Sequence, residues 1–470
     1  MNSRFAGRGP RPWSICFSTV CVRVRRAAVV LTRAAAALAA ASLVTPALST
    51  PAAKAEIERR ISLTEALRLA EENATPVKAA VHDSLSAEHG LSAAKDAWFP
   101  TLGVTGNAFG FHPQDPLGIG PLALPADWSE IYATNLRLNY PIYTGGRRSN
   151  DIGRQKESLN AASSQISVER LTNAYESRRA YIGLLIAERM VEAARASLAR
   201  VGLIRTHVGN LHAAGMADSL DILEAEISLR GANRFLEEAR GDRQNASAAL
   251  ARLLALPGDE TIVPTEPVPD PEPPSAEPPA PADIAGRPEL AAASHRIESA
   301  RYQKSIVSAG YLPVVNGMGG YALVKPDIGE REGEWQDIWW LGLTLSWDLN
   351  LGGQEFSQSK QASETVRSLE MRHKDLEDAL LLQARIAWNN VSEAYNVYAI
   401  RRDEYSLASR RFALAVDVQK AGRMTVNRLL ELEADLTQTQ QQFEAARLRY
   451  HAAVTDYLYA VGSGAIREGF

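Results

Sequence analysis

The feature that most constrains this chain is a long pattern that occurs twice. The segment LRLNYPIYTGG occupies residues 136–146, and LTLSWDLNLGG occupies residues 343–353, 207 positions later. Both segments alternate apolar with polar residues and end in Gly-Gly. The same offset aligns HAAGMADSLDILEAE at 212–226 with QKAGRMTVNRLLELE at 419–433. An offset that stays constant over so long a stretch indicates a tandem duplication, which has to be recognised before a fold is assigned.

The duplication divides the chain into two repeats. Upstream of these segments the register slips by a few residues, but DAWFPTLGVTG (96–106) still resembles SAGYLPVVNGM (308–318). We assign residues 56–260 to the first repeat and 284–463 to the second, followed by a C-terminal tail over 464–470.

A connector rich in proline and acidic residues lies between the repeats, over 261–283. Proline breaks helices and cannot donate to a β-ladder, so we expect an exposed linker in polyproline or coil form. A proline-rich ligand for a signalling domain is the alternative that this composition also allows.

The N-terminus has the features of an export signal. An arginine-rich lead precedes the apolar stretch AAAALAAASLV at 34–44, which is too short to span a bilayer as a helix. Ala53-Lys54-Ala55 is an A-x-A cleavage site, so residues 1–55 are predicted to be a cleaved signal peptide. A membrane anchor or a disordered tail is the alternative. Cleavage removes both cysteines, Cys16 and Cys21, so the mature chain is predicted to lack disulfides and cysteine ligands.

Each repeat is predicted to contain a β-hairpin, over 101–143 in the first and 313–351 in the second. Leu341, Leu343 and Leu345 alternate with small or polar residues, which is the period of a strand with one apolar face. Aromatic residues gather near the strand ends. Together with the export signal, these long alternating strands favour a membrane β-barrel over a soluble sheet packed on a core.

Four strands are too few to close such a barrel. Membrane barrels begin at about eight strands. An open strand edge in hydrocarbon would leave backbone N–H and C=O groups without partners. Several chains must therefore share one barrel, and the sequence predicts an oligomer.

Long helical hairpins are predicted over 149–255 and 354–460. Their apolar residues recur at spacings of three, four and seven, which is typical of a coiled-coil seam. Gly215 and Gly422 lie where each first helix ends, because glycine supplies the left-handed cap that reverses the chain. Asp218 and Thr425 are the expected N-caps of the returning helices.

The order of these elements, written twice, resembles the TolC family of Gram-negative outer-membrane channels. The resemblance rests on the export signal, the FP-led hairpin, the Gly-Gly junction, the long helix and the A-G-x-x-[ST/D] turn. It covers essentially all of the mature chain. It implies a mainly α fold with a membrane β-barrel part, in which a homotrimer forms a twelve-stranded barrel and an α-helical periplasmic tunnel.

The resemblance also implies a function and a location. Members are passive channel-tunnels of tripartite efflux pumps or type I secretion systems, located in the outer membrane and extending into the periplasm. The implied partners are a periplasmic adaptor protein, an inner-membrane transporter of RND or ABC type, and outer-membrane lipid. Nucleic acid is not an expected partner, because the net charge of −4 gives no polyanion signal.

The sequence offers no catalytic or metal-binding motif. It contains neither G-x-S-x-G nor H-E-x-x-H. His207 and His212 are five residues apart, which is not a usual ligand spacing on one helical face. We therefore expect no enzymatic activity, no metal site and no cofactor.

The candidate functional residues lie at the two helical tips, where the resemblance implies a constriction and a docking surface. The predicted docking residues are Gly215, Met216, Gly422 and Arg423. The predicted pore-lining residues are Asp218, Asp221, Glu224, Arg428 and Glu431. Arg428 stands where the family typically has a gate aspartate, so pairing with a carboxylate of a neighbouring helix is an alternative to cation binding. Ordinary acidic capping of a helix N-terminus is the alternative for all these carboxylates.

Two other classes of protein share some of these features. A periplasmic adaptor, or membrane fusion protein, also has an export signal and a long coiled-coil hairpin. It would have one hairpin between lipoyl-like halves rather than two strand pairs. A soluble coiled-coil structural protein would pack the strands into a globular head.

Overall fold

The computed structural model describes residues 57–110, 118–119, 122–123, 130–256, 260–274, 277–325, 335–348 and 351–469. The chain divides into two units, Met1–Ala55 and Glu56–Phe470. The predicted signal peptide, 1–55, lies outside the described residues. The fold is that of the second unit.

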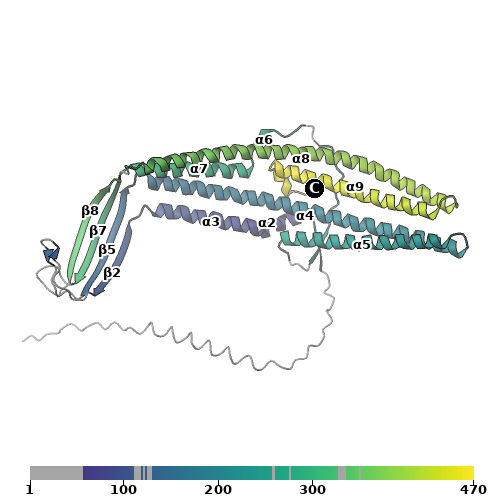
Figure 1. Ribbon diagram of the computed structural model, residues 1–470, viewed down its shortest axis with the longest axis horizontal. Helices are drawn as coiled ribbons and strands as arrows, with labels where there is room; N and C mark the ends of the chain where they lie inside the picture. The colour runs from purple at the N-terminus through teal and green to yellow at the C-terminus, as the bar shows by residue number, and fades with distance from the viewer. Residues whose placement is uncertain are drawn as a thin grey trace, which may run out of the picture. The chain divides into compact units, whose positions relative to one another are not determined.

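The elements of this unit follow the predicted order twice (Figure 1). The first series is β1 (Ile57–Ile61), α2 (Leu63–Asn73), α3 (Thr75–Asp96), β2 (Thr101–Gly110), β3 (Gly118–Ile119), β4 (Leu122–Ala123), β5 (Glu130–Tyr143), α4 (Arg147–Ala213) and α5 (Ser219–Leu253). The second series is β6 (Glu260–Pro264), α6 (Pro281–Ile284), α7 (Pro288–Ser308), η1 (Ala309–Tyr311), β7 (Val314–Lys325), β8 (Gln336–Ser346), α8 (Gln354–Lys420), α9 (Val426–Ala460) and η2 (Gly464–Arg467).

The helices of the two hairpins have the same lengths and the same relative positions. α4 and α8 each contain 67 residues, and α5 and α9 each contain 35. Each helix of the second hairpin begins and ends 207 positions after its counterpart. The Gly-Gly pairs end at the N-caps of the long helices, where Gly146 and Gly353 have left-handed φ values of 81° and 71°. Glycine adopts this conformation without the steric cost of a Cβ.

Four strands form one antiparallel sheet in the order β2-β5-β7-β8. β2 pairs with β5 and β7 pairs with β8, as the two predicted hairpins require, and β5 joins the repeats by pairing with β7. β8 ends at Ser346, earlier than the alternation through Leu351 predicts. The Nε1 of the next residue, Trp347, donates a hydrogen bond to the Tyr311 carbonyl at 3.2 Å, which ties the end of β8 to the residues just before β7.

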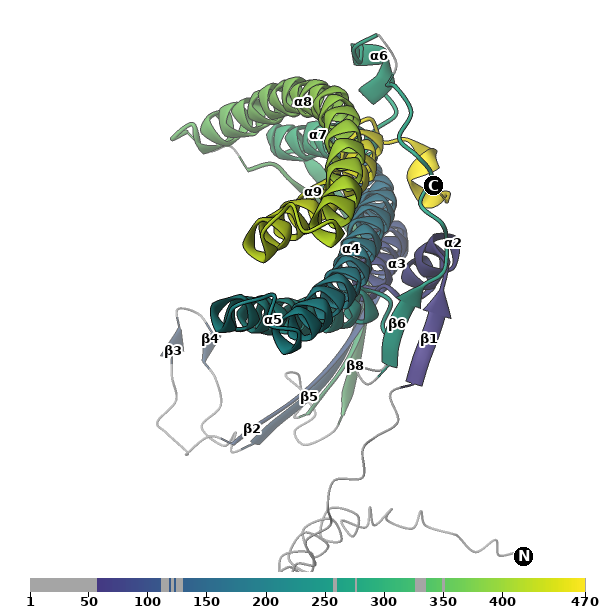
Figure 2. The ribbon, with the colours of Figure 1, turned by 90° about the vertical axis from the view of Figure 1, so that its right-hand side faces the viewer.

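The long helices pack side by side. α4 packs against α3, α5, α7 and α9, whereas α8 packs against α7 and α9. Near the tips the order is α5-α4-α9-α8, and Figure 2 shows these helices as a curved row seen from that end. More than twice as many residues of α4 as of α8 are buried. α4 is therefore an inner member of the row, and α8 lies at its end.

The largest apolar core lies at mid-length, where β1, α2 and β6 cover α4, α5 and α9. It includes the fully buried Tyr181, Ile61 and Leu250. The Tyr181 hydroxyl donates to the Ile61 carbonyl at 3.2 Å, and burial raises the pKa of Tyr181 to about 12. This core joins the two repeats, because α9 belongs to the second and β1, α2, α4 and α5 to the first.

The connector between the repeats differs from its expected exposed form. Glu260–Pro264 is strand β6, which pairs in parallel with β1. Further on, Val268 is 5% exposed, the Tyr450 hydroxyl donates to the Glu272 carbonyl at 2.7 Å, and His451 Nε2 donates to the Pro269 carbonyl at 3.0 Å. A proline-rich backbone forms no internal hydrogen bonds, so its carbonyls are free to accept bonds from side chains of α9.

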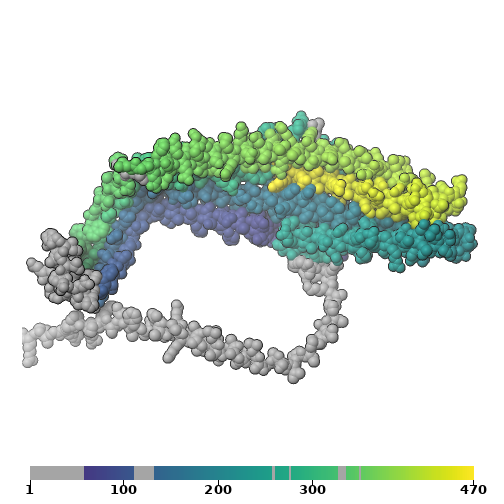
Figure 3. All heavy atoms as spheres, in the orientation of Figure 1, coloured from purple at the N-terminus to yellow at the C-terminus, as the bar shows by residue number. Residues whose placement is uncertain are grey.

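The long helices form one continuous surface on the face seen in Figure 3. None of the helices in the part of the chain that the structure describes carries an apolar stretch long enough for a bilayer crossing.

Ala255, at the end of α5, is the one described residue other than glycine with positive φ, at 53°. The Leu256 N–H donates to the Ala251 carbonyl at 2.9 Å, and the Ala255 N–H donates to the Arg252 carbonyl at 3.2 Å. These two bonds make a Schellman motif. The counterpart 207 positions later is Gly462, with φ of 69°.

We predict that Ala255→Gly stabilises the protein by about 1 kcal/mol, because it removes the left-handed strain of an L-residue. Thermal unfolding followed by circular dichroism would measure the change. The same substitution inside α5, Ala248→Gly, is the control and should lower stability by roughly 0.5–1 kcal/mol. Equal effects of the two variants would contradict the strain argument.

Candidate functional site at the helical tips

The two tip turns are built in the same way. At the end of α4, Met216 N–H bonds to the Leu211 carbonyl at 2.8 Å and Gly215 N–H to that of His212 at 2.9 Å. Gly215 has φ of 73°. His212 Nδ1 also donates to the Ala217 carbonyl at 2.9 Å, so this histidine is engaged in the turn itself.

The second turn repeats these bonds at the end of α8. Arg423 N–H bonds to the Val418 carbonyl at 3.1 Å, Gly422 N–H bonds to that of Gln419 at 2.8 Å, and Gly422 has φ of 73°. Both are Schellman turns, which satisfy carbonyls that a helix C-terminus would otherwise leave unpaired.

The expected N-caps are present on both returning helices. The Asp218 carboxylate accepts from the Ser219 N–H at 2.6 Å, and the Asp218 N–H donates to Asp221 Oδ2 at 3.2 Å, which makes a capping box. Thr425 accepts from the Arg428 N–H at 3.4 Å. Asp218 and Asp221 are therefore engaged by the first turn of α5, where the helix dipole also favours negative charge.

The remaining candidate charges lie further along the returning helices. Arg428 and Glu431 form an ion pair at 2.6 Å, and both side chains are exposed. The partner of Arg428 within the protomer is thus one turn away on α9 itself, not on a neighbouring helix. Glu224 is half-buried on α5. The sequence placed these residues near the turns but did not identify this pairing.

The first tip also carries an apolar surface that sequence reasoning missed. Met216, Leu220, Leu223 and Ile227 are each between 60% and 71% exposed. At the second tip Leu429 and Leu430 are buried in a cluster with α4 residues. A comparison of the two repeats could have revealed this difference. Leu220 aligns with Asn427, and Ile227 aligns with Ala434.

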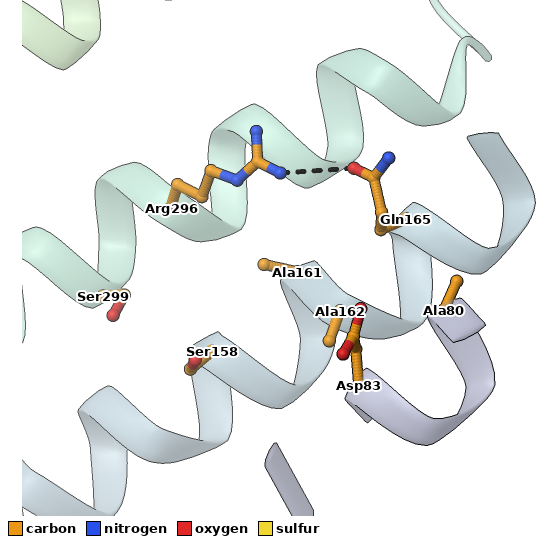
Figure 4. Close-up of a pocket in the computed structure, with 8 residues that line it drawn as sticks. All are labelled: Ala80, Asp83, Ser158, Ala161, Ala162, Gln165, Arg296 and Ser299. Carbon is orange, nitrogen blue, oxygen red and sulfur yellow. Dashed lines mark hydrogen bonds between the residues drawn. The ribbon is translucent and has the colours of Figure 1, made fainter. Parts of the chain in front are cut away.

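A groove of about 330 Å³ lies between α3, α4 and α7, far from the tips (Figure 4). Its walls are mostly small side chains, and Arg296 donates to Gln165 Oε1 across it at 3.2 Å. The lining contains neither histidine nor cysteine. Among the described residues, no group of three or more His, Cys, Asp or Glu side chains is arranged to hold a metal ion.

Known proteins match this chain over most of its length. The profile of the outer membrane efflux protein family matches residues 66–256 and 283–462. The outer membrane efflux protein BepC of Brucella suis biovar 1 (strain 1330) is 21% identical over 381 residues, covering 81% of this chain and 80% of BepC. The Campylobacter jejuni CmeC outer membrane channel superposes with a TM-score of 0.73 at 15% identity, covering 86% of each chain. VceC from Vibrio cholerae gives a TM-score of 0.72 at 17% identity, covering 86% of this chain and 96% of VceC.

These similarities confirm the resemblance, the fold class and the channel role inferred from the sequence, and they exclude the adaptor and structural-protein alternatives. Channels of this family lie in the outer membrane, extend into the periplasm and are not enzymes. They are homotrimers that work with adaptor proteins and inner-membrane pumps. With both of its repeats matched, the chain belongs to the outer membrane efflux protein family.

Proposed function

We propose that this chain is the outer-membrane exit of a tripartite efflux pump, and that a periplasmic adaptor docks on its two tip turns. BepC is named an efflux protein, which favours efflux over type I secretion. The inner-membrane partner is then a transporter of RND or ABC type. The energy for export comes from that partner, and the chain contributes a passive conduit.

The observation that carries the docking proposal is the identical construction of the two turns. Gly215 and Gly422 share the same φ of 73°, and a Cβ added to either would meet no atom within 4 Å. Met216 is 71% exposed, and Arg423 is exposed as well. Two rigid turns per chain, repeated in a trimer, would offer an adaptor six similar contact points.

The five charged candidates are proposed to line the pore next to these turns. An exposed ion pair such as Arg428–Glu431 contributes only about 0.2–1 kcal/mol. Because both partners lie on α9, a movement of this helix does not require the pair to break. Adaptor contacts could therefore displace the start of α9 without losing this interaction.

The test of docking uses Gly215→Val and Gly422→Val. Because open space surrounds both positions, the substitutions should cost only about 1–2 kcal/mol of local backbone strain. We expect an unchanged amount of trimer but loss of efflux and of adaptor cross-linking. Ala421→Val is the control, since it places the same side chain in the turn at a residue with negative φ, −77°.

Trimer abundance, efflux and cross-linking would be measured in the same cells. Normal efflux in both glycine variants would refute the docking role. Loss of the trimer itself would show that these glycines serve folding.

A second prediction concerns the lipid-facing surface of β8. Leu341, Leu343 and Leu345 are 82%, 73% and 67% exposed on one face of this strand. Leu343→Arg or Leu345→Arg should reduce the protein recovered in the outer membrane, because arginine costs roughly 2–4 kcal/mol near the bilayer midplane. Thr344→Arg lies on the opposite face and should be tolerated. Equal damage from the threonine variant would show that the faces are assigned the wrong way round.

A further inference from the structure

A cavity of about 620 Å³ lies between α7 and α8, next to the start of the four-stranded sheet. One end of it is made by Gly145, Ala309 and Leu312, which belong to the junctions between strands and helices. The rest comes from the last two turns of α7 and from residues 363–370 of α8. The cavity therefore lies where the helices meet the strands that are predicted to enter the membrane.

This cavity opens on the outer side of the helical row. Arg367, in its α8 wall, lies two heptads from Leu381, so the two residues share one side of a helix that packs as a coiled coil. Leu381 packs against the apolar cluster that contains Ile284 of α6. Figure 2 shows α6 on the convex side of the curved row. A curved row that closes into a tunnel has its convex side outside, so the cavity faces away from the lumen.

An exposed apolar path leads from the sheet to the cavity. Leu343 and Leu345, on the face of β8 that we assign to lipid, are followed two residues later by Trp347, which is 56% exposed. Trp347 Nε1 donates to the Tyr311 carbonyl at 3.2 Å, and the next residue, Leu312, lines the cavity and is 44% exposed. Exposed aromatic residues at the edge of an apolar band are typical of the level at which lipid headgroups lie.

Three cationic side chains gather in this cavity. Arg301 and Lys304 come from α7, and Arg367 comes from α8. Glu370 is the only acidic side chain among the described residues that line it, and it lies 2.8 Å from Arg301 Nη2. No described residue forms an ion pair or a hydrogen bond with the Lys304 ammonium. The lining therefore has more positive than negative charge, and one of its cations is unpaired.

The two arginines are each held by a carboxylate one turn away. Arg301 Nη1 lies 2.6 Å from Glu298, and Arg367 Nη1 lies 2.7 Å from Glu364. Neither of these glutamates lines the cavity. A guanidinium has five N–H donors, so both arginines keep donors for a phosphate, and the lysine adds a compact charge. Three hydroxyl groups complete the polar lining, from Ser305, Ser308 and Ser363.

We propose that this cavity binds the phosphate headgroup of a glycerophospholipid from the periplasmic leaflet of the outer membrane. The phosphate lies between Lys304 and the two arginines, and the acyl chains run over Trp347 towards Leu345. A lipid is favoured over a free anion because the charged cavity opens beside the exposed apolar surface, which a soluble phosphate would leave uncovered. A lipid held in this way fixes the level at which the helices leave the membrane.

Native mass spectrometry of the purified, detergent-solubilised trimer tests this proposal. The trimer is incubated with dioleoyl phosphatidylglycerol, and the lipids retained per trimer are counted. We expect the double variant Lys304→Gln with Arg367→Gln to retain several-fold less of this lipid than the wild type. The matched control is Arg372→Gln with Lys374→Gln, which removes one arginine and one lysine from exposed positions of α8 outside the cavity. It should retain as much lipid as the wild type.

Two further probes separate the headgroup from the acyl chains. Dioleoylglycerol has the same chains without the phosphate, and the wild type should retain several-fold less of it than of phosphatidylglycerol. Inorganic phosphate supplies the anion without the chains, and it should not displace the lipid at equal concentration.

Equal retention of phosphatidylglycerol by the wild type and the cavity variant would overturn the site, as would an equal loss in the cavity variant and its control. Retention of dioleoylglycerol as strong as that of phosphatidylglycerol would exclude recognition of the phosphate. Displacement by equimolar inorganic phosphate would assign the cavity to a free anion instead. If the cavity variant forms no trimer, Lys304→Gln is compared with Lys374→Gln, because Lys304 is exposed and has no ion pair among the described residues to lose. Equal retention by these two single variants would again overturn the site.

Discussion

The structure depends on the need of every strand edge to find hydrogen-bond partners. In the described sheet, β2 and β8 each have a strand beside one edge only, and in hydrocarbon no water can supply partners for an open edge. Assembly is therefore a condition for the strands to enter a membrane at all. The homotrimeric state of the family satisfies this condition, because closure around a ring removes every edge.

Because the chain is duplicated, the contact between its two repeats can also serve as the contact between two chains. The junction of β5 with β7 and of α4 with α9 is already a working interface between two repeats. A second copy needs only to present the same surfaces in the same register. Differences between the repeats then show where a residue meets its own chain and where it would meet another. Arg200, bonded to Glu433, is replaced by Leu407, and the buried Leu430 is matched by the exposed Leu223.

The tips obey a different constraint, which is local. A Schellman turn and an N-cap involve residues within a few positions of one another, so these features could be predicted from Gly215, Gly422, Asp218 and Thr425 without knowledge of the fold. The partner of Arg428 could not, because Glu431 and the carboxylates of neighbouring helices were equally available in the sequence. The docking and pore-lining roles of the tip residues are therefore proposals. The backbone conformation of the turns, by contrast, follows from the local sequence.

The sequence by itself determined the duplication, the ends of the long helices and the alternation of the strands, since each is encoded by periodicity or by a glycine or capping residue at a fixed position. Only the tertiary structure decided which faces are covered. It placed α9 against α4, bound the proline-rich connector to Tyr450 and His451, and left α5 and α8 open. Burial is a property of what lies beside a residue in space, and for these residues the neighbours are more than a hundred positions away along the chain.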